Sequence, residues 1–385
     1  MKIIKLKRTI IALITAALCI ILSGCGREKA APETEAPETD APEARTDRTD
    51  EDQELYNAGV YTPIEILGYS RYTGPNADRF LKEGDKIAVI SPSALPSREQ
   101  ADAVIKGLEE WGYVPVEGKY VCTEGRTLEN CREDLVWALT DPEIKGIFCV
   151  RGGWAASEVM DTMDLDLIKE AKKPIIGYSD ISAYHAGWTT AGLTSVHASM
   201  SAAFTDLPEE CADAEEHILK GEIPSYRCKG SRYDNPGTAK GVLVGGNLTV
   251  MLTVVNTSYD STVLDEPYIL LLEDVDSSYL NTHCCLTVLK NSGVLDRASG
   301  IILGEWNEFR PETNDYDGGS RGGRFSSVYD MIYRQFLKDL DVPIAYGFPA
   351  GHGEYNYPLL MGAEVRLDVG DDGFTLEWMD TETDQ

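Results

Sequence analysis

The sequence predicts an α/β protein in which strands and helices alternate along most of the chain. Short apolar runs, typical of buried strands, recur between residues 86 and 346, and segments with helical spacing separate them. Several of these runs end in glycine or in a polar residue, as strands do where they lead into a loop. Strands joined through helices in this way form a parallel sheet with helices on both faces.

The first half of the chain supplies four of these strands, and we expect folded structure to begin near Arg79. The strands are the runs 86–91, 113–116, 146–150 and 174–177, and the helical patterns are 98–111, 126–139 and 165–171. Ser93, Gly152 and Ser179 follow three of the strands. Because ligands bind at the carboxyl ends of parallel strands, these residues are expected at the functional edge of the sheet.

The pattern changes after about Asp206. A helix is predicted at 208–220, and residues 221–236 are polar and rich in turn formers, so the junction between two domains is placed there. A second block follows, with strands at 241–247, 268–273, 300–304 and 343–346, helices at 248–255, 280–291 and 328–340, and closing β structure at 359–376. Residues 307–324 read as a polar, glycine-rich loop.

The first 24 residues have the pattern of an export signal. Four basic residues precede the apolar run 10–22, which is too short to remain as a membrane span. The sequence L-S-G-C that ends at Cys25 resembles the lipobox of bacterial lipoproteins, in which the cysteine carries a diacylglycerol after cleavage. The alternative is an ordinary secretory signal followed by an unrelated cysteine. We expect Cys25 to anchor the protein to the outer face of the bacterial cell membrane.

Residues 27–54 consist mostly of Ala, Pro, Glu, Thr and Asp and have almost no apolar side chains to bury, so we expect an extended, disordered tether. Removing the four basic residues of the signal changes the formal net charge from −29 to −33. A charge of this sign argues against nucleic acid as a partner and against docking on an anionic membrane face.

The predicted organisation has five parts. They are a lipoprotein signal (1–24), a lipid-anchored tether and lead-in (25–75), an N-terminal α/β domain (76–206), an inter-domain connection (207–236) and a C-terminal domain (237–385).

The cysteines predict neither a zinc site nor a disulfide framework. Of nine, Cys19 leaves with the signal and Cys25 is lipidated in this interpretation, which leaves an odd number and no C-x-x-C pair. Cys149 lies in an apolar strand and is expected in the core. One bridge, Cys122–Cys131, stays open for an exported protein.

The segment 150–183 carries the first candidate chemistry. Gly152 and Gly153 end one strand, and Ser179 lies on the turn after the next. A serine past a strand end, beside a glycine turn, is the layout of a nucleophile facing an oxyanion hole. The sequence G-Y-S-D nevertheless lacks the second glycine of G-x-S-x-G, and a serine that caps the next helix is the simpler interpretation of these residues alone.

Glu273 and His352 also lie just past strand ends. Acyl transfer by a serine needs a base within hydrogen-bond reach and an acid that fixes the orientation of the base. His352 lies between two glycines after a strand, where a general base would be accessible, whereas His185 is expected to be packed and His197 to lie near the same site. Glu273 fits equally well as an acid that caps the following helix.

Several motifs, in this order, resemble a known family of serine peptidases, the LD-carboxypeptidases and microcin C immunity peptidases. They are G-D-K-I-A-V-I-S-P-S, R-G-G-W, I-G-Y-S-D-I-S-A, G-V-L-V-G-G-N-L, L-L-L-E-D, G-I-I-L-G and F-P-A-G-H, between about Gly84 and about Leu367. The resemblance implies a flavodoxin-like N-terminal parallel-sheet domain, a C-terminal mixed α/β domain, and an active site in the cleft between them.

The resemblance also assigns the site. Ser179 resembles the family's nucleophile, His352 its general base and Glu273 the acid that orients the base. The amide of Asp180 and the region of Gly153 and Trp154 inherit the oxyanion hole and substrate contacts. No metal or other cofactor is implied. The family usually continues its glycine turn as G-G-Y-G, whereas this chain has G-G-W-A at 152–155, and this departure puts the oxyanion geometry in question.

The resemblance, the anchor and the tether together imply an LD-carboxypeptidase of the bacterial envelope that releases the terminal D-alanine from a peptidoglycan tetrapeptide. One alternative is an amidase with the same triad that cleaves microcin C-like aminoacyl conjugates, with Phe309 or Tyr316 stacking on a base. The other is a lipoprotein that binds wall fragments without catalysis. Homodimers are frequent in the family, although no residue pattern here predicts one.

Overall fold

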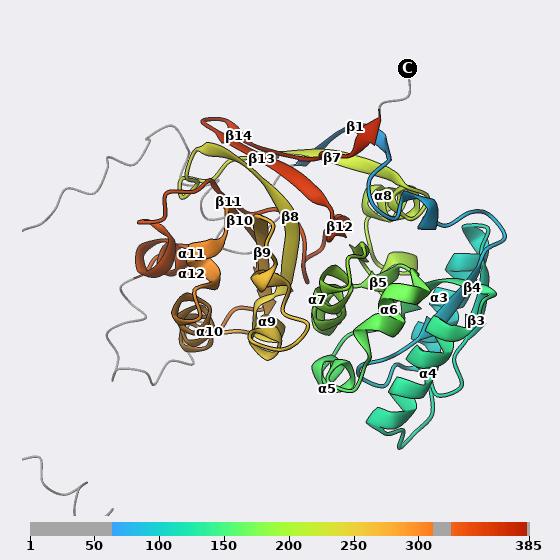
Figure 1. The fold of residues 1–385 in the computed structure, drawn as a ribbon. Coiled ribbons are helices and arrows are strands. Elements are labelled where there is room, and N and C mark those ends of the chain that lie inside the picture. The colour runs from blue at the N-terminus through green and yellow to red at the C-terminus, as the bar shows by residue number, and fades with distance from the viewer. Residues whose placement is uncertain (1–63, 311–324, 383–385) are drawn as a thin grey trace, which may run out of the picture. The chain divides into compact units, whose positions relative to one another are not determined.

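The computed structural model describes residues 64–310 and 325–382, which form two sheets with their helices (Figure 1). The first sheet has six strands in the order β12-β6-β5-β4-β2-β3. Its strands are β2 (Lys86–Ile90), β3 (Val114–Glu117), β4 (Ile144–Cys149), β5 (Ile175–Gly177), β6 (Ser195–His197) and β12 (Leu359–Met361). Only β12 is antiparallel to its neighbour. The order from β3 to β6 is that of a flavodoxin-like sheet, so the predicted fold class is confirmed.

The helices of this half follow the predicted alternation. They are α3 (Arg98–Glu110), α4 (Leu128–Thr140), α5 (Ala156–Met160), α6 (Leu165–Ala171), α7 (Ser182–Thr190) and α8 (Glu209–Leu219). Sequence signals for their starts are visible, because α3 and α4 each begin with a capping box, Ser97 with Gln100 and Thr127 with Asn130. Each box satisfies helix amides that have no partner within the helix, which fixes where the helix begins.

The second sheet has nine strands in the order β11-β10-β9-β8-β13-β14-β7-β1-β15. They are β1 (Ile64–Tyr72), β7 (Glu222–Lys229), β8 (Gly237–Asn247), β9 (Tyr268–Val275), β10 (Gly300–Asn307), β11 (Ile344–Tyr346), β13 (Glu364–Gly370), β14 (Gly373–Trp378) and β15 (Thr381–Glu382). The strands β8 to β11 are parallel to one another. Its helices are α9 (Leu248–Val254), α10 (Tyr279–Asn291), α11 (Val294–Arg297) and α12 (Val328–Ile332), which a π-helical turn at Tyr333–Leu337 extends.

Two segments differ from the prediction. Folded structure is already present at Ile64, ahead of the expected start near Arg79, because β1 pairs antiparallel with β7. The strand β7 itself lies in the segment that we expected to be turn-rich. Neither strand forms a continuous apolar run: β1 is mostly half-buried or exposed, and β7 mixes buried with more exposed residues. Each pairs with a strand that is distant along the chain. Their pairing brings together, in the second sheet, one strand that precedes β2 along the chain and one that follows β6.

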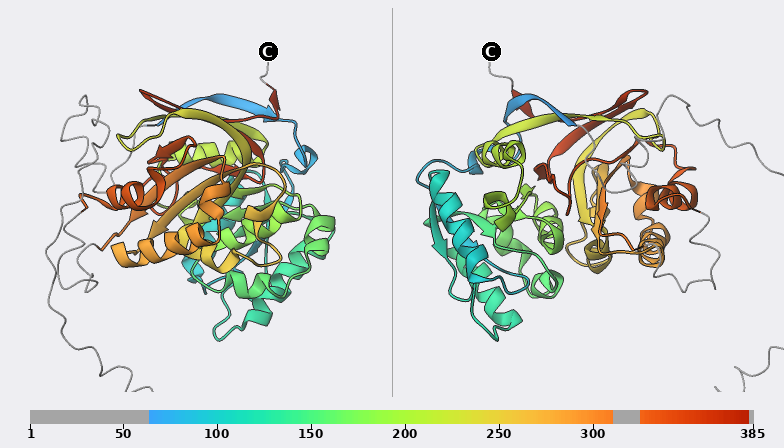
Figure 2. Two further views of the ribbon diagram at one scale, coloured as in Figure 1. Left: turned by 60° about the vertical axis from the view of Figure 1, so that its left-hand side comes forward. Right: turned by 180° about the vertical axis from the view of Figure 1, so that it is seen from behind.

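The two sheets meet at α7, which packs against α9 and β8 (Figures 1 and 2). The strand β8 of the nine-stranded sheet ends at this contact, at Asn247. The backbone N–H of Asn247 donates to the side-chain Oγ of Ser182, the first residue of α7, at 3.0 Å. The carboxyl ends of β5 and β9 therefore face the same region, and the candidate residues that follow these strands are brought together there.

The described cysteines are free thiols, so the Cys122–Cys131 bridge left open by the sequence is not formed. Cys149 is fully buried, as predicted. Cys25, the signal and the tether lie outside the described residues. Among the described helices, none combines the length and the apolar character needed to cross a bilayer.

Candidate active site

Ser179 lies on a sharp strand-to-helix turn. The strand β5 ends at Gly177, and Ser179 begins a 3-10 turn (Ser179–Ile181) that leads directly into α7. Its φ of 65° lies in the left-handed region, which a residue with a side chain rarely adopts. Backbone strain of this kind concentrates at functional sites and is a property of nucleophile elbows. The geometry is therefore that of an elbow even without the second glycine of G-x-S-x-G. The capping interpretation fails because the N-cap residues of the 3-10 turn and of α7 are Tyr178 and Ile181, not Ser179.

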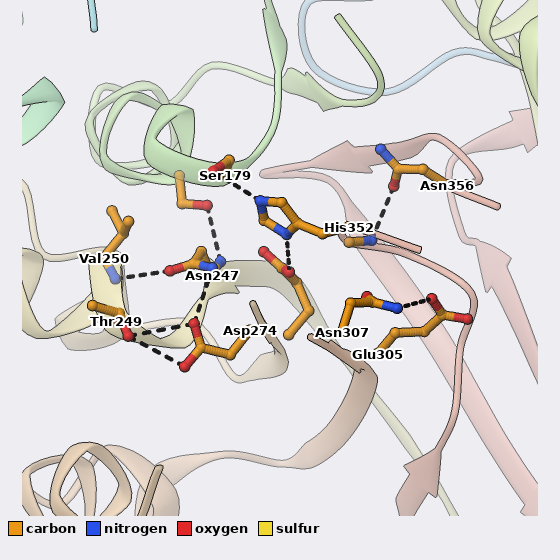
Figure 3. A network of polar contacts seen from close by, with 12 residues as sticks. Ser179, Asn247, Thr249, Val250, Asp274, Glu305, Asn307, His352 and Asn356 are labelled. Atoms are coloured by element: carbon orange, nitrogen blue, oxygen red, sulfur yellow. Dashed lines mark hydrogen bonds and ion pairs between the residues drawn. The ribbon is translucent and has the colours of Figure 1, made fainter. Parts of the chain in front are cut away.

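Ser179, His352 and Glu273 lie in one chain of hydrogen bonds (Figure 3). Ser179 Oγ is 3.0 Å from His352 Nε2, and His352 Nδ1 is 2.9 Å from Glu273 Oε2. Because an ionised carboxylate can only accept, Nδ1–H donates to Glu273 and Nε2 is left to accept the serine hydroxyl proton. This is the arrangement that a hydroxyl, a base and an orienting acid need for acyl transfer.

The electrostatics of the three groups support a base with increased proton affinity. The Glu273 side chain is fully buried, that of His352 is 16% exposed, and Glu273 Oε1 has no hydrogen-bond partner among the described residues. Burial by itself lowers the pKa of His352. The charge of Glu273 and its hydrogen bond outweigh burial and raise this pKa above the ordinary 6.5, with Asp274 and Glu308 adding to the rise.

The glycine that faces the nucleophile is Gly152, the first residue of the glycine turn predicted beside Ser179, whereas the family resemblance pointed to Gly153. A Cβ at Gly152 would lie 2.9 Å from Ser179 Cβ and 3.3 Å from the Asp180 nitrogen, whereas a Cβ at Gly153 would overlap Ala94. Asp180 is the second residue of the 3-10 turn, so its N–H has no partner within that turn. The amide of Asp180 and the Gly152–Gly153 backbone thus border one small space beside Ser179 Oγ.

The side chain of Asp180 has a second task that the sequence did not reveal. Its Oδ2 accepts the hydroxyl of Ser93 at 2.5 Å and the amide of Ala156 at 2.9 Å. Burial raises the pKa of this carboxyl, and these two bonds partly offset the effect. The carboxyl therefore joins three chain segments, those after β2, β4 and β5, and fixes the glycine turn relative to the nucleophile. Only the strand-end position of Ser93 signalled this contact in the sequence.

Trp154 is 73% exposed, and its carbonyl accepts a long bond of 3.4 Å from Ser93 Oγ. Ala155 follows it with a φ of 93° and no side-chain cap at the start of α5. Glycine adopts this conformation at little cost, whereas a Cβ makes it strained. Ala155 thus stands where the family's G-G-Y-G pattern has its last glycine, and its Cβ strains the backbone at that position.

We predict that Ala155→Gly stabilises the protein. Relief of the left-handed strain should exceed the entropy that glycine adds to the unfolded chain, for a net gain of up to about 1 kcal/mol. Thermal or urea unfolding measures the change, with Ala156→Gly as control, since Ala156 is helical and should lose stability when changed. An Ala155→Gly variant that melts below the wild type would contradict the assignment of strain.

A second polar network lies beside the triad on the opposite face of β9. Asn247 Nδ2 donates to Asp274 Oδ1 at 3.2 Å, and Thr249 Oγ1 donates to the same carboxyl. Burial, together with the charge of Glu273, raises the pKa of Asp274 to about 6. Through the bond between Asn247 and Ser182, this network connects β9 to the helix that follows the nucleophile (Figure 3).

The other histidines expected near the site are buried and packed. His185 contacts Ser195 Oγ and the Gly177 carbonyl, each at 2.8 Å, as the packed role predicts. Neither ring nitrogen of His197 has a partner among the described residues, and its ring lies 6.0 Å from that of Tyr178. Burial lowers the pKa of both, to about 4 and about 3 respectively, so both are neutral at physiological pH.

The loop after β10 is described only to residue 310. Phe309 packs edge-on against Tyr279 at 4.9 Å between ring centroids, and Arg310 pairs with Asp276 at 2.7 Å. Tyr316 lies outside the described residues. The ring of Phe309, a candidate for stacking on a base, thus already packs against another ring of the protein.

Both halves of the chain are similar to known proteins. Two family models match the chain, the LD-carboxypeptidase N-terminal domain over residues 87–198 and the LD-carboxypeptidase C-terminal domain over residues 240–367. A protein of Synechocystis is 30% identical over 301 residues, which are 76% of this chain and 94% of that protein. The murein tetrapeptide carboxypeptidase of Pseudomonas aeruginosa is 25% identical, covering 79% of this chain and 99% of its own.

The microcin C7 self-immunity protein of Escherichia coli is 24% identical and covers 78% of this chain and 96% of its own. Among solved structures, muramoyltetrapeptide carboxypeptidase from Oxalobacter formigenes is similar with a TM-score of 0.67 at 22% identity, over 77% of this chain and 100% of that one. The likeness between the structures shows that the two-sheet fold is shared.

Proposed function

The chain belongs to the LD-carboxypeptidase family and is a carboxypeptidase, and from this premise we propose that it releases the terminal D-alanine from peptidoglycan tetrapeptides. The observation that carries the proposal is the hydrogen-bonded chain from Ser179 through His352 to the buried Glu273. The bond cleaved would join an L-centre to the terminal D-residue.

In the acylation step, Ser179 Oγ attacks the scissile carbonyl carbon while His352 Nε2 takes the hydroxyl proton. Glu273 holds His352 in the required tautomer and stabilises the imidazolium. The oxyanion forms in the space bordered by the Asp180 amide and the Gly152–Gly153 backbone. His352 then gives the proton to the departing amine of D-alanine, and an ester on Ser179 remains.

In the deacylation step, His352 removes a proton from water, which attacks the ester and returns Ser179 to its starting form. Both steps require neutral His352. Because the pKa of His352 is raised above 6.5, activity should fall as the pH drops through that raised value.

We also propose that the enzyme works in the bacterial envelope, anchored through a lipid on Cys25. The basic and apolar segments before L-S-G-C and the acidic tether after it support this location. An anchored enzyme on a long spacer suits a wall substrate, whereas an immunity peptidase that destroys an imported antibiotic would be needed inside the cell.

The test is D-alanine release from a disaccharide tetrapeptide by the purified protein. Release from the tetrapeptide, with none from a tetrapeptide that ends in L-alanine, is the expected result. If no D-alanine appears, an aminoacyl nucleotide conjugate is the next substrate, and its cleavage would favour the microcin-type amidase. A protein that cleaves neither substrate but binds the disaccharide tetrapeptide in calorimetry would favour the non-catalytic alternative.

We predict that Gly152→Ala lowers kcat at least about 10²-fold without unfolding the protein. Its Cβ would lie 3.1 Å from Ser179 Oγ and 3.3 Å from the Asp180 nitrogen, so it narrows the space where the oxyanion forms. D-Alanine release measures the loss, and circular dichroism checks the fold. Full activity in Gly152→Ala would place the oxyanion elsewhere.

A further inference from the structure

A further buried carboxyl lies near the triad and has no role in the mechanism above. Glu305 on β10 is 6% exposed, and its Oε2 accepts Asn307 Nδ2 at 3.2 Å (Figure 3). The remaining oxygen of that amide, Asn307 Oδ1, is buried without a hydrogen-bond partner among the described residues. A carboxyl buried with so few hydrogen bonds costs stability, so its retention at this place needs a reason.

A β-bulge places this carboxyl. The strand β10 pairs with β9 in regular register up to Leu303, which lies opposite Leu272, but Trp306 lies opposite Asp274. The residues 304 and 305 of β10 therefore share a single partner position on β9, that of Glu273. Bulges of this kind occur next to active sites, where they re-aim a side chain. Here the extra residue brings Glu305 alongside the acid of the triad.

The two carboxyls support the two ends of the turn that carries His352. A Cβ at Gly351 would lie 2.7 Å from Glu273 Oε2, and a Cβ at Gly353 would overlap Glu305 Oε2. The backbone joins the same elements, because the Glu305 amide donates to the Ala350 carbonyl at 3.2 Å. Each glycine thus lets one carboxyl approach the backbone on one side of the general base.

Two carboxyls and one amide lie around Glu305. Glu273 faces it from β9, Glu354 from the turn, and Asn307 contacts it from its own strand. Burial raises the pKa of Glu305 to about 7, the bond from Asn307 lowers it, and the charges of Glu273 and Glu354 raise it. His352, which Glu273 holds through its Nδ1, is the residue before Gly353, and the backbone at Gly353 lies close to Glu305 Oε2. An ionised carboxylate at Glu305, close to the turn that carries His352, would favour the protonated imidazole.

We infer that Glu305 is a positioning residue for the general base. It holds the Gly353 side of the turn against the bulge of β10, and its ionised form favours the protonated form of His352. The inference rests on the proposed triad and is independent of which peptide is cleaved.

The first test measures how fast a fluorophosphonate labels Ser179 in the full chain as a function of pH. Labelling needs neutral His352 but no peptide substrate. Glu305→Gln removes the charge and keeps the shape, so the acid limb of the profile should move to lower pH by about half a unit. The exposed Glu354→Gln should move it less, because solvent screens its charge. Superimposed profiles for wild type and Glu305→Gln would overturn the role of the charge.

The second test is a double-mutant cycle on the contact with Gly353. This glycine has no positive φ, so alanine is allowed by the backbone, and its Cβ should push the turn away from Glu305. We expect Gly353→Ala to slow labelling about 100-fold in the wild type, and about tenfold or less when Glu305→Ala has made room. Equal losses in both backgrounds would overturn the contact, with thermal melting of each variant as the check on folding.

The outcomes separate this inference from the proposed function. If the wild-type protein is labelled but releases no D-alanine, the proposed substrate is wrong, and both tests of Glu305 remain valid. A wild-type protein that is not labelled at all would remove the triad, and the inference with it.

Discussion

Ser179→Ala is expected to reduce D-alanine release from a disaccharide tetrapeptide by about 10⁴-fold or more. The hydroxyl is the atom that forms the acyl bond, and the 3.0 Å contact with His352 Nε2 is the path by which it loses its proton. Without the hydroxyl, His352 can only activate a water molecule that takes the place of Ser179 Oγ. The residual rate should reflect substrate binding and the oxyanion space alone.

The matched control is Ser157→Ala on α5, a neighbouring serine outside the hydrogen-bonded triad. It should keep the wild-type rate, and both variants should melt as the wild type does. Fluorophosphonate labelling adds a second measurement, since it should disappear only in Ser179→Ala. Release that survives in Ser179→Ala would exclude this serine as the nucleophile.

The sequence predicted the alternating fold because buried parallel strands have short, continuous apolar runs. The helix at 165–171 has the predicted bounds, and Ser179 lies past a strand end as expected. Periodicity could not pair Ser179 with His352, since nothing local relates two turns so distant along the chain. Their strand-end positions made the pairing one hypothesis among others and the family resemblance assigned it, and the structure brings the two side chains to hydrogen-bond distance.

Other features depend on tertiary contacts that leave no local pattern. The bond from Ser93 to Asp180 joins loops after different strands, and the bulge that aims Glu305 exists only in the pairing of β10 with β9. The strand β1 was missed for a related reason, because most of its residues are half-buried or exposed and its pairing partner β7 is distant along the chain. Sequence patterns thus located the edge of the sheet where chemistry occurs, whereas the supports of the site required the structure.

Glu273→Gln should lower kcat by about 10³- to 10⁴-fold while leaving the protein folded. An amide in place of the carboxylate no longer stabilises the imidazolium and permits the wrong tautomer of His352, a loss of the size known for the corresponding change in the serine protease triad. Such a factor corresponds to about 4–5 kcal/mol of barrier. Stability should not fall in parallel, because Glu273 is a fully buried charge with one oxygen unpartnered, and neutralising it removes a desolvation cost.

The direction in which the pH profile of Glu273→Gln moves distinguishes the loss of the carboxylate charge from a structural defect. The charge and hydrogen bond of Glu273 hold the pKa of His352 above 6.5, so Glu273→Gln should lower that pKa and move the acid limb of kcat/KM to lower pH. The loss relative to wild type should therefore be smaller in mildly acid solution, where wild-type His352 is already protonated, than in alkaline solution. Glu273→Asp, which keeps the charge but shortens the reach to His352 Nδ1, should retain an acid limb closer to that of the wild type. A Glu273→Gln enzyme with an unmoved acid limb, or with less than a tenfold loss of kcat, would assign the orienting role to another carboxyl. The candidates would then be Asp274 and Glu305, two buried acids whose pKa values the charge of Glu273 raises.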